Sequence, residues 1–104
     1  DALTIPMMKL GAVGVISVLA NIMPGEVADV VNLMLKGKVK EAEEKQAKLM
    51  PIIKAMFIET NPAPVKTACG LTGLCSPKLR LPLCELEPEN LSKLKAALKQ
   101  QKLI

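Results

Sequence analysis

Histidine, tryptophan and tyrosine are absent from the sequence, and Phe57 is its only aromatic residue. Without histidine, the chain cannot build a Ser-His-Asp triad, a Cys-His pair or a zinc site that uses histidine ligands. Surfaces that bind nucleic acid usually combine a basic stripe with stacking aromatics or arginines. Here the net charge is a modest +4, and Arg80 is the one arginine. These absences predict that the chain holds no metal and binds no nucleic acid.

A long uninterrupted apolar run is also missing. The longest candidate, residues 10–23, follows a lysine in the manner of a secretory signal, but Gly11, Gly14, Ser17 and Asn21 divide it. It is also shorter than the roughly 20 residues that a helix needs to cross a bilayer. We therefore expect no membrane partner, and we interpret this stretch as a buried strand with its flanking turns.

Cysteine is scarce and unpatterned. Cys69, Cys75 and Cys84 are odd in number and show no CxxC spacing. Unpaired thiols are typical of a reducing compartment, where small buried cysteines act as ordinary packing residues. The sequence therefore predicts a cytoplasmic protein whose cysteines serve packing rather than chemistry.

The first part of the chain alternates helix and strand. Residues 3–10 predict a short helix that Thr4 caps, and residues 24–36 predict a helix with one apolar face. Between them, residues 14–18 (GVISV) form a β-branched run of the kind found in strands buried on both faces. Gly37 then stands where the C-terminal cap of a helix belongs. Helix, strand and helix with short joints indicate an α/β fold.

The rest of the chain has the pattern of helices only. Residues 38–59 predict one long helix, which Pro51 should kink or divide into two. A short helix over residues 64–71 follows, then an extended connector over residues 76–83. The closing helix begins near Pro88 and carries a stripe of leucines. The chain is therefore predicted to be mostly helical.

Few side chains are suited to catalysis. Lys54 and Lys66 stand in apolar surroundings, and burial can lower the pKa of a lysine enough for Schiff-base chemistry. Neither lysine has a neighbour that could shuttle protons. Glu41, Glu43 and Glu44 are better interpreted as a solvated helix face. The residues alone indicate a small α/β-plus-helix piece without a self-contained active site, so we assign no catalytic residue.

Three segments, in this order, resemble the dihydrodipicolinate synthase family. Residues 1–4 (DALT) leading into residues 14–18 resemble the last unit of that family's barrel. Residues 57–66 (FIETNPAPVK) are similar to its NPxPVK segment, and residues 79–83 (LRLPL), before a Leu- and Lys-rich helix, are similar to its C-terminal ending. The similarity covers essentially all 104 residues.

The resemblance implies an α/β parent, a (β/α)8 TIM barrel followed by an all-helical C-terminal region. Residues 1–37 would be the last helix-strand-helix portion of the barrel, and residues 38–104 the C-terminal helical region; the chain itself would be mostly α. A last strand without neighbours leaves rows of unpaired amides and carbonyls on both of its edges. We therefore expect the missing N-terminal barrel portion to be the main partner of this chain.

The resemblance also implies an activity. Members of the family are lyases, class I aldolases that condense pyruvate with aspartate semialdehyde in lysine (diaminopimelate) biosynthesis. A lysine on the sixth strand forms a Schiff base with pyruvate, a tyrosine from an earlier strand relays protons, and no cofactor is needed. This chain has no tyrosine and starts beyond the sixth strand, so it is expected to be inactive alone. Of the substrate-contacting positions only Ile16 carries over, because its backbone carbonyl lines the pyruvate pocket, at the end of a strand where TIM-barrel sites lie.

Family members are commonly tetramers or dimers, so a homo-oligomer is expected. Two alternatives stay open. The chain is also similar to related keto-acid sugar aldolases such as N-acetylneuraminate lyase, although residues 61–66 and 79–83 favour the synthase. Its six methionines would alternatively suit a stand-alone helical binding module with an adaptable apolar groove.

Overall fold

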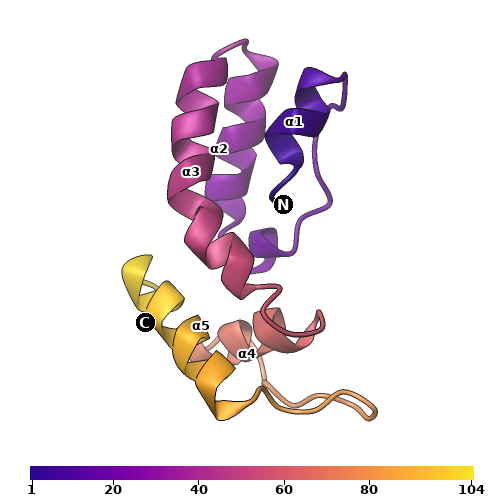
Figure 1. Cartoon of the computed structure of the whole chain (residues 1–104), viewed down its shortest axis with the longest axis vertical. Helices are drawn as coiled ribbons and strands as arrows, with labels where there is room; N and C mark the ends of the chain where they lie inside the picture. Colours follow the sequence, from indigo (N-terminus) through magenta and orange to yellow (C-terminus); the bar gives the residue numbers. More distant parts are fainter. The chain divides into compact units, whose positions relative to one another are not determined.

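Five α-helices and one 3₁₀-helix, with no strand, make up the computed structural model, which describes all of residues 1–104 (Figure 1). The prediction of a mostly helical chain is confirmed. The packing divides the chain into two compact units, residues 1–53 and residues 54–104. The division after Gly37 concerns the parent barrel and stays a prediction. The elements are α1 (Thr4–Lys9), η1 (Leu19–Asn21), α2 (Pro24–Leu35), α3 (Val39–Ala55), α4 (Ala63–Leu71) and α5 (Pro88–Gln100).

The predicted buried strand at residues 14–18 is wrong for this chain. Residues 12–17 have no regular secondary structure, Val13 is exposed, and the side chain of Ile16 is fully exposed. Residues 13–17 make no backbone–backbone hydrogen bond. A strand exists only where a neighbouring strand pairs with its amides and carbonyls, and these 104 residues contain no such neighbour.

In the first unit, α2 and α3 form a helical hairpin (Figure 1). Gly37 ends α2 with a positive φ of 74°, as predicted. Its N–H donates to the carbonyl of Met34 at 3.0 Å, and the N–H of Lys38 donates to that of Leu33 at 2.9 Å. These two bonds form a Schellman motif, which satisfies helix-end carbonyls and reverses the chain within three residues.

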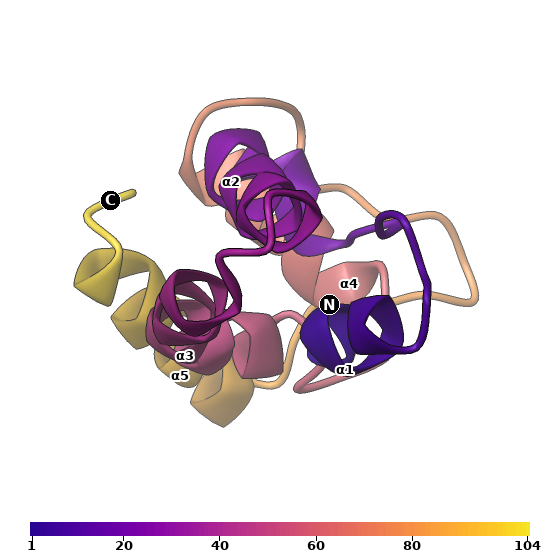
Figure 2. The same ribbon diagram turned by 90° about the horizontal axis from the view of Figure 1, so that it is seen from above.

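The core of the first unit lies between α1, α2 and α3, which stand at the three corners of a small bundle (Figure 2). An ion pair supplements this apolar packing. Lys45 of α3 approaches Glu26 at 2.8 Å and Asp29 at 2.9 Å, both on α2, and these hydrogen bonds raise the pKa of Lys45. The pair is partly exposed, so apolar burial dominates the stability of this unit. The buried apolar side chains are Ile5, Leu19, Ile22, Val30, Ala42, Leu49, Ile52 and Ile53.

Pro51 was predicted to kink the long helix or to divide it, and the division does not occur, since α3 runs unbroken from Val39 to Ala55. Proline has no N–H and therefore cannot donate to the carbonyl four residues before it, which here belongs to Ala47. Pro51 itself is exposed, whereas Leu49, Ile52 and Ile53 around it are buried. Burial of these three side chains offsets the lost hydrogen bond and holds the helix together.

In the second unit, α4 packs against α5 (Figure 1). The predicted leucine stripe of α5 is confirmed, because Leu94 and Leu98 are completely buried and Leu91 is half-buried. Glu59 fixes the start of this helix by accepting hydrogen bonds from the N–H of Glu87 at 2.9 Å and the side-chain amide of Asn90 at 2.8 Å. The predicted connector over residues 76–83 indeed has no helix or strand. The other buried apolar side chains of this unit are Ala55, Met56, Ala63, Pro64, Val65, Ala68 and Leu86.

Candidate functional site

The predicted site residue, Ile16, lies in the exposed stretch that precedes η1. Its carbonyl and its N–H form no hydrogen bond within the chain. Because buried backbone groups are almost always paired in folded proteins, an extended stretch with five successive unpaired residues is suited to pairing with other polypeptide. The chain therefore presents the Ile16 carbonyl as a free acceptor rather than as part of a finished pocket.

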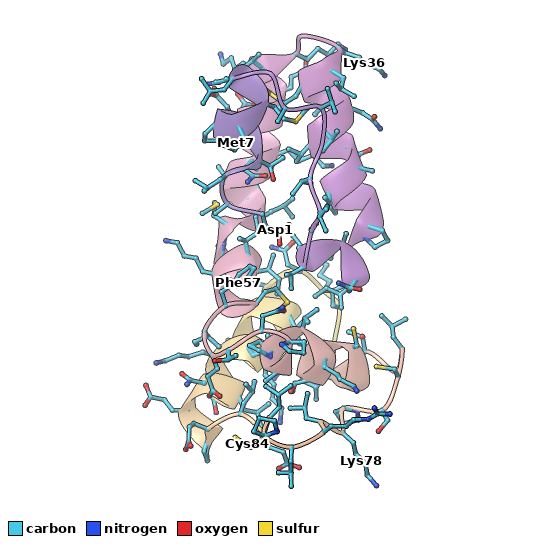
Figure 3. All side chains as sticks on the ribbon, turned by 90° about the vertical axis from the view of Figure 1, so that its right-hand side faces the viewer. Asp1, Met7, Lys36, Phe57, Lys78 and Cys84 are labelled. Carbon is cyan, nitrogen blue, oxygen red and sulfur yellow. The ribbon has the colours of Figure 1, made fainter.

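The end of this stretch is fixed by Asp1, which lies between α3 and the segment that leads to η1 (Figure 3). One carboxylate oxygen of Asp1 accepts hydrogen bonds from the N–H groups of Val18 at 3.0 Å and Leu19 at 3.1 Å. The other accepts the hydroxyl of Ser17, whose oxygen in turn accepts the N–H of Ala20 at 2.9 Å. The carboxylate thus satisfies the free N–H groups at the start of η1 and fixes the residue directly after Ile16.

The backbone carbonyl of Asp1 collects three further donors. The N–H of Thr4 lies at 3.2 Å, the hydroxyl of Thr4 at 2.8 Å, and the side-chain amide of Gln46 at 2.9 Å. The prediction that Thr4 caps α1 is wrong, because Leu3 occupies the N-cap position and the Thr4 hydroxyl donates to Asp1 instead. Asp1 therefore joins α1, α3 and η1 around the end of the candidate strand.

Sequence reasoning did not single out Asp1 or Ser17 as structural anchors. Ser17 carries a local signal, since serine is favoured where its hydroxyl can accept an N–H at the start of a helical turn. Asp1 carries none, because it acts on residues sixteen to eighteen positions away. A small cavity of about 10 Å³ beside this network is lined by Asp1, Thr4, Leu19, Val27, Val30, Gln46, Leu49 and Ile53.

The other candidate catalytic residues are not brought to partners. Lys54 is exposed in the last turn of α3, and Lys66 is half-buried on α4. Neither makes an ion pair or a side-chain hydrogen bond. Glu43 forms an exposed ion pair with Lys9, as expected for a solvated helix face.

The prediction that the cysteines are buried packing residues is wrong. Cys75 and Cys84 are exposed, and Cys69 is half-buried. The buried apolar side chains of the second unit fill its core without contributions from these cysteines. No three of the Cys, Asp and Glu side chains gather into a group that could hold a metal ion. None of the helices combines the length and the apolar character that crossing a membrane requires.

Comparison with known proteins gives a consistent result. A model of the dihydrodipicolinate synthetase family matches residues 1–101. The 4-hydroxy-tetrahydrodipicolinate synthase of Endomicrobium trichonymphae is 54% identical over 99 residues, which cover 95% of this chain and 34% of that protein. That of Hydrogenobaculum sp. (strain Y04AAS1) is 51% identical over 104 residues, covering 100% of this chain and 36% of the relative.

Solved structures agree with these relatives. The crystal structure of dihydrodipicolinate synthase from Aquifex aeolicus matches with a TM-score of 0.97 and 50% identity, over 99% of this chain and 35% of that one. The chloride-inhibited enzyme from Acinetobacter baumannii, complexed with pyruvate, matches with a TM-score of 0.94 and 35% identity, over 100% and 36% of the two chains. This chain therefore spans about a third of the length of the relatives that it matches.

Proposed function

Because this chain belongs to the dihydrodipicolinate synthetase family, which matches residues 1–101, we propose that the whole protein is a 4-hydroxy-tetrahydrodipicolinate synthase. This lyase would condense pyruvate with aspartate semialdehyde in lysine biosynthesis. Relatives that carry the synthase name match nearly the whole chain at 50% identity or more. They favour the synthase over a keto-acid sugar aldolase and over a stand-alone helical module.

The chain is one part of a TIM-barrel protein, as its match to about a third of such proteins shows. Within the parent, we assign residues 14–18 to the last barrel strand. The exposed side chains of Val13 and Ile16 and the unpaired backbone of residues 13–17 support this assignment. In a closed barrel, upstream strands would pair with the two edges of this segment, and the layers on either face of the sheet would cover its side chains.

In the parent, the residues that react with pyruvate would come from the upstream part. A lysine there would form the Schiff base, and a tyrosine there would relay protons; the present 104 residues contain no tyrosine. The contribution of this chain would be the carbonyl of Ile16. A carbonyl only accepts hydrogen bonds, so it would face a donor on the reacting species, such as the protonated nitrogen of the Schiff base, rather than the carboxylate of pyruvate.

The hydrogen bonds around Asp1 would fix the position of the Ile16 carbonyl. Asp1 holds Ser17, Val18 and Leu19, the three residues that follow Ile16, through its carboxylate. A catalytic constellation must be positioned within a fraction of an ångström, and residues held by a second layer of hydrogen bonds meet this demand best. We therefore regard Asp1 and Ser17 as positioning residues.

Borohydride trapping tests the proposed activity. When the whole protein is incubated with pyruvate and reduced with borohydride, a stable adduct should form on a lysine outside the 104 residues described. Tryptic peptides that contain Lys54 or Lys66 should keep their unmodified masses. A sample treated with borohydride alone is the control, and an adduct on either of these two lysines would overturn the assignment of the nucleophile.

The role of the Ile16 carbonyl can be tested by replacing the amide between Ile16 and Ser17 with an ester, which makes this carbonyl a weaker acceptor. We expect kcat/KM for pyruvate to fall about five- to tenfold, the effect of losing roughly 1 kcal/mol of hydrogen bonding. Ile16→Val keeps the carbonyl and should have little effect. An ester that removes the Val15 amide controls for the loss of a strand hydrogen bond, and equal effects of the two esters would contradict the proposal.

We further propose that the whole protein is a cytoplasmic homo-oligomer, a dimer or a tetramer. Leu3, Met7 and Leu10 of the α1 region are exposed, and clustered apolar surface of this kind is usually covered by other protein. The upstream part of the chain and a second copy are the two candidates. Light scattering of the whole protein measures its oligomeric state directly.

A further inference from the structure

Two cysteines are brought together where α4 ends. Gly73, with a positive φ of 78°, reverses the chain there. The N–H of Leu74 donates to the carbonyl of Cys69 at 2.8 Å, and the N–H of Gly73 donates to the carbonyl of Gly70 at 3.2 Å. These bonds form a second Schellman motif. Cys75 directly follows Leu74, so the motif brings Cys75 back toward the last turn of α4, which contains Cys69.

A close contact holds the returning segment in place. A Cβ added at Gly70 would lie 2.6 Å from the Cβ of Pro77, so the proline ring sits where a side chain would otherwise stand. Gly70 directly follows Cys69, and Pro77 lies two residues beyond Cys75. The segment that contains Cys75 is therefore bonded to the end of α4 on one side and packed against α4 on the other.

The two thiols have different surroundings. Cys75 is exposed, whereas Cys69 is half-buried. Burial, and next to it the neighbouring Cys75 thiol, raises the pKa of the Cys69 thiol. The hydroxyl of Thr72 donates to the carbonyl of Cys69 at 3.1 Å and further fixes this turn. An oxidant in solvent would therefore meet Cys75 first and find Cys69 beside it.

We propose that Cys69 and Cys75 form a reversible intramolecular disulfide when the protein meets a peroxide. The thiolate of Cys75 attacks one oxygen of hydrogen peroxide, the O–O bond breaks, and the products are a sulfenic acid and, after protonation, water. The sulfur of Cys69 then attacks the sulfenic sulfur, the S–O bond breaks, and the hydroxyl leaves as a second water. Two thiols are oxidised and one peroxide is reduced to two waters, so the step balances.

Cys84 provides an internal control. It is exposed on the segment that leads to α5 (Figure 3) and carries no comparable turn. Trypsin separates Cys84 from the other two cysteines, because it cuts after Lys66, Lys78, Arg80 and Lys93. Residues 67–78 then hold both members of the proposed pair in one peptide, and residues 81–93 hold Cys84.

The experiment treats the whole protein with hydrogen peroxide, blocks free thiols with iodoacetamide and maps the tryptic peptides by mass spectrometry. The peptide of residues 67–78 should lose two hydrogen atoms and resist alkylation, and dithiothreitol should reverse both changes. Cys75→Ser should abolish this loss, and Cys84→Ser should leave it unchanged. Gly70→Ala, which displaces Pro77 without breaking α4, should slow the reaction several-fold.

Three results would overturn the proposal. One is a disulfide that links Cys84 to either partner in preference to the pair. Another is an alkylated Cys69 beside a sulfinic or sulfonic acid at Cys75, which would show that the second thiol does not reach the first. The third is an unchanged rate of disulfide formation in the Gly70→Ala variant, which would show that the contact between Gly70 and Pro77 does not hold the two cysteines together.

Discussion

Leu94→Ala is expected to lower the free energy of unfolding of the C-terminal helical unit by about 2–5 kcal/mol. Leu94 is 0% exposed and belongs to α5, the helix that packs against α4. Removing its three outer carbons loses the transfer free energy of buried apolar surface and leaves a cavity that neighbouring helices fill only in part. Urea denaturation of the whole protein, followed by circular dichroism, measures the change.

Leu81→Ala is the matched control, because the same three carbons are removed from a side chain that is 91% exposed. It should change stability by no more than about 0.5 kcal/mol. A loss below about 1 kcal/mol for Leu94→Ala would show that α5 does not pack as described. Equal losses for the two variants would point to Leu81 being covered in the whole protein.

Asp1→Ala should cost about 2–4 kcal/mol, since three hydrogen bonds to a charged carboxylate are lost together. The N–H groups of Val18 and Leu19 lose their acceptor, and the Ser17 hydroxyl loses its partner. The bonds to the Asp1 backbone carbonyl are kept, which limits the loss to the η1 end of the candidate strand. Thermal unfolding of the whole protein provides the measurement.

Two further substitutions make this prediction specific. Asp1→Asn keeps one acceptor oxygen and should recover part of the loss. Asp29→Ala removes an exposed carboxylate that shares Lys45 with Glu26, so it should cost no more than about 0.5 kcal/mol. A cost for Asp1→Ala as small as that for Asp29→Ala would mean that solvent replaces the carboxylate without penalty.

The helices could be predicted from the sequence because their signals are local. The apolar face of α2, the leucines of α5 and the capping position of Gly37 all lie within one or two helical turns of the residues that they organise. The continuity of α3 through Pro51 could not be predicted in this way. Proline lowers helix stability locally, whereas the burial of its neighbours, which keeps the helix intact, is a property of the packed unit.

The strand and the site could not be predicted in the same way. A run such as residues 14–18 carries the composition of a strand, but its partners must come from other polypeptide, and composition does not say whether they are present. The bonds from Asp1 to Ser17 and Val18 connect residues far apart in sequence. The exposure of Cys75 likewise follows from the turn at Gly73 rather than from the cysteine itself.

The turn between α2 and α3 restricts which residues can occupy position 37. Apart from Gly37 itself and its two chain neighbours, no atom lies within 4 Å of the position where a Cβ would stand on Gly37, so bulk is not what the turn rejects. Its positive φ is what an L-residue resists, because left-handed backbone brings the Cβ of an L-residue against its own carbonyl. Position 37 therefore accepts or rejects a side chain according to the chirality of the residue. D-Alanine, introduced by chemical synthesis, would fit the positive φ and stiffen the turn, whereas L-alanine at the same position would strain it.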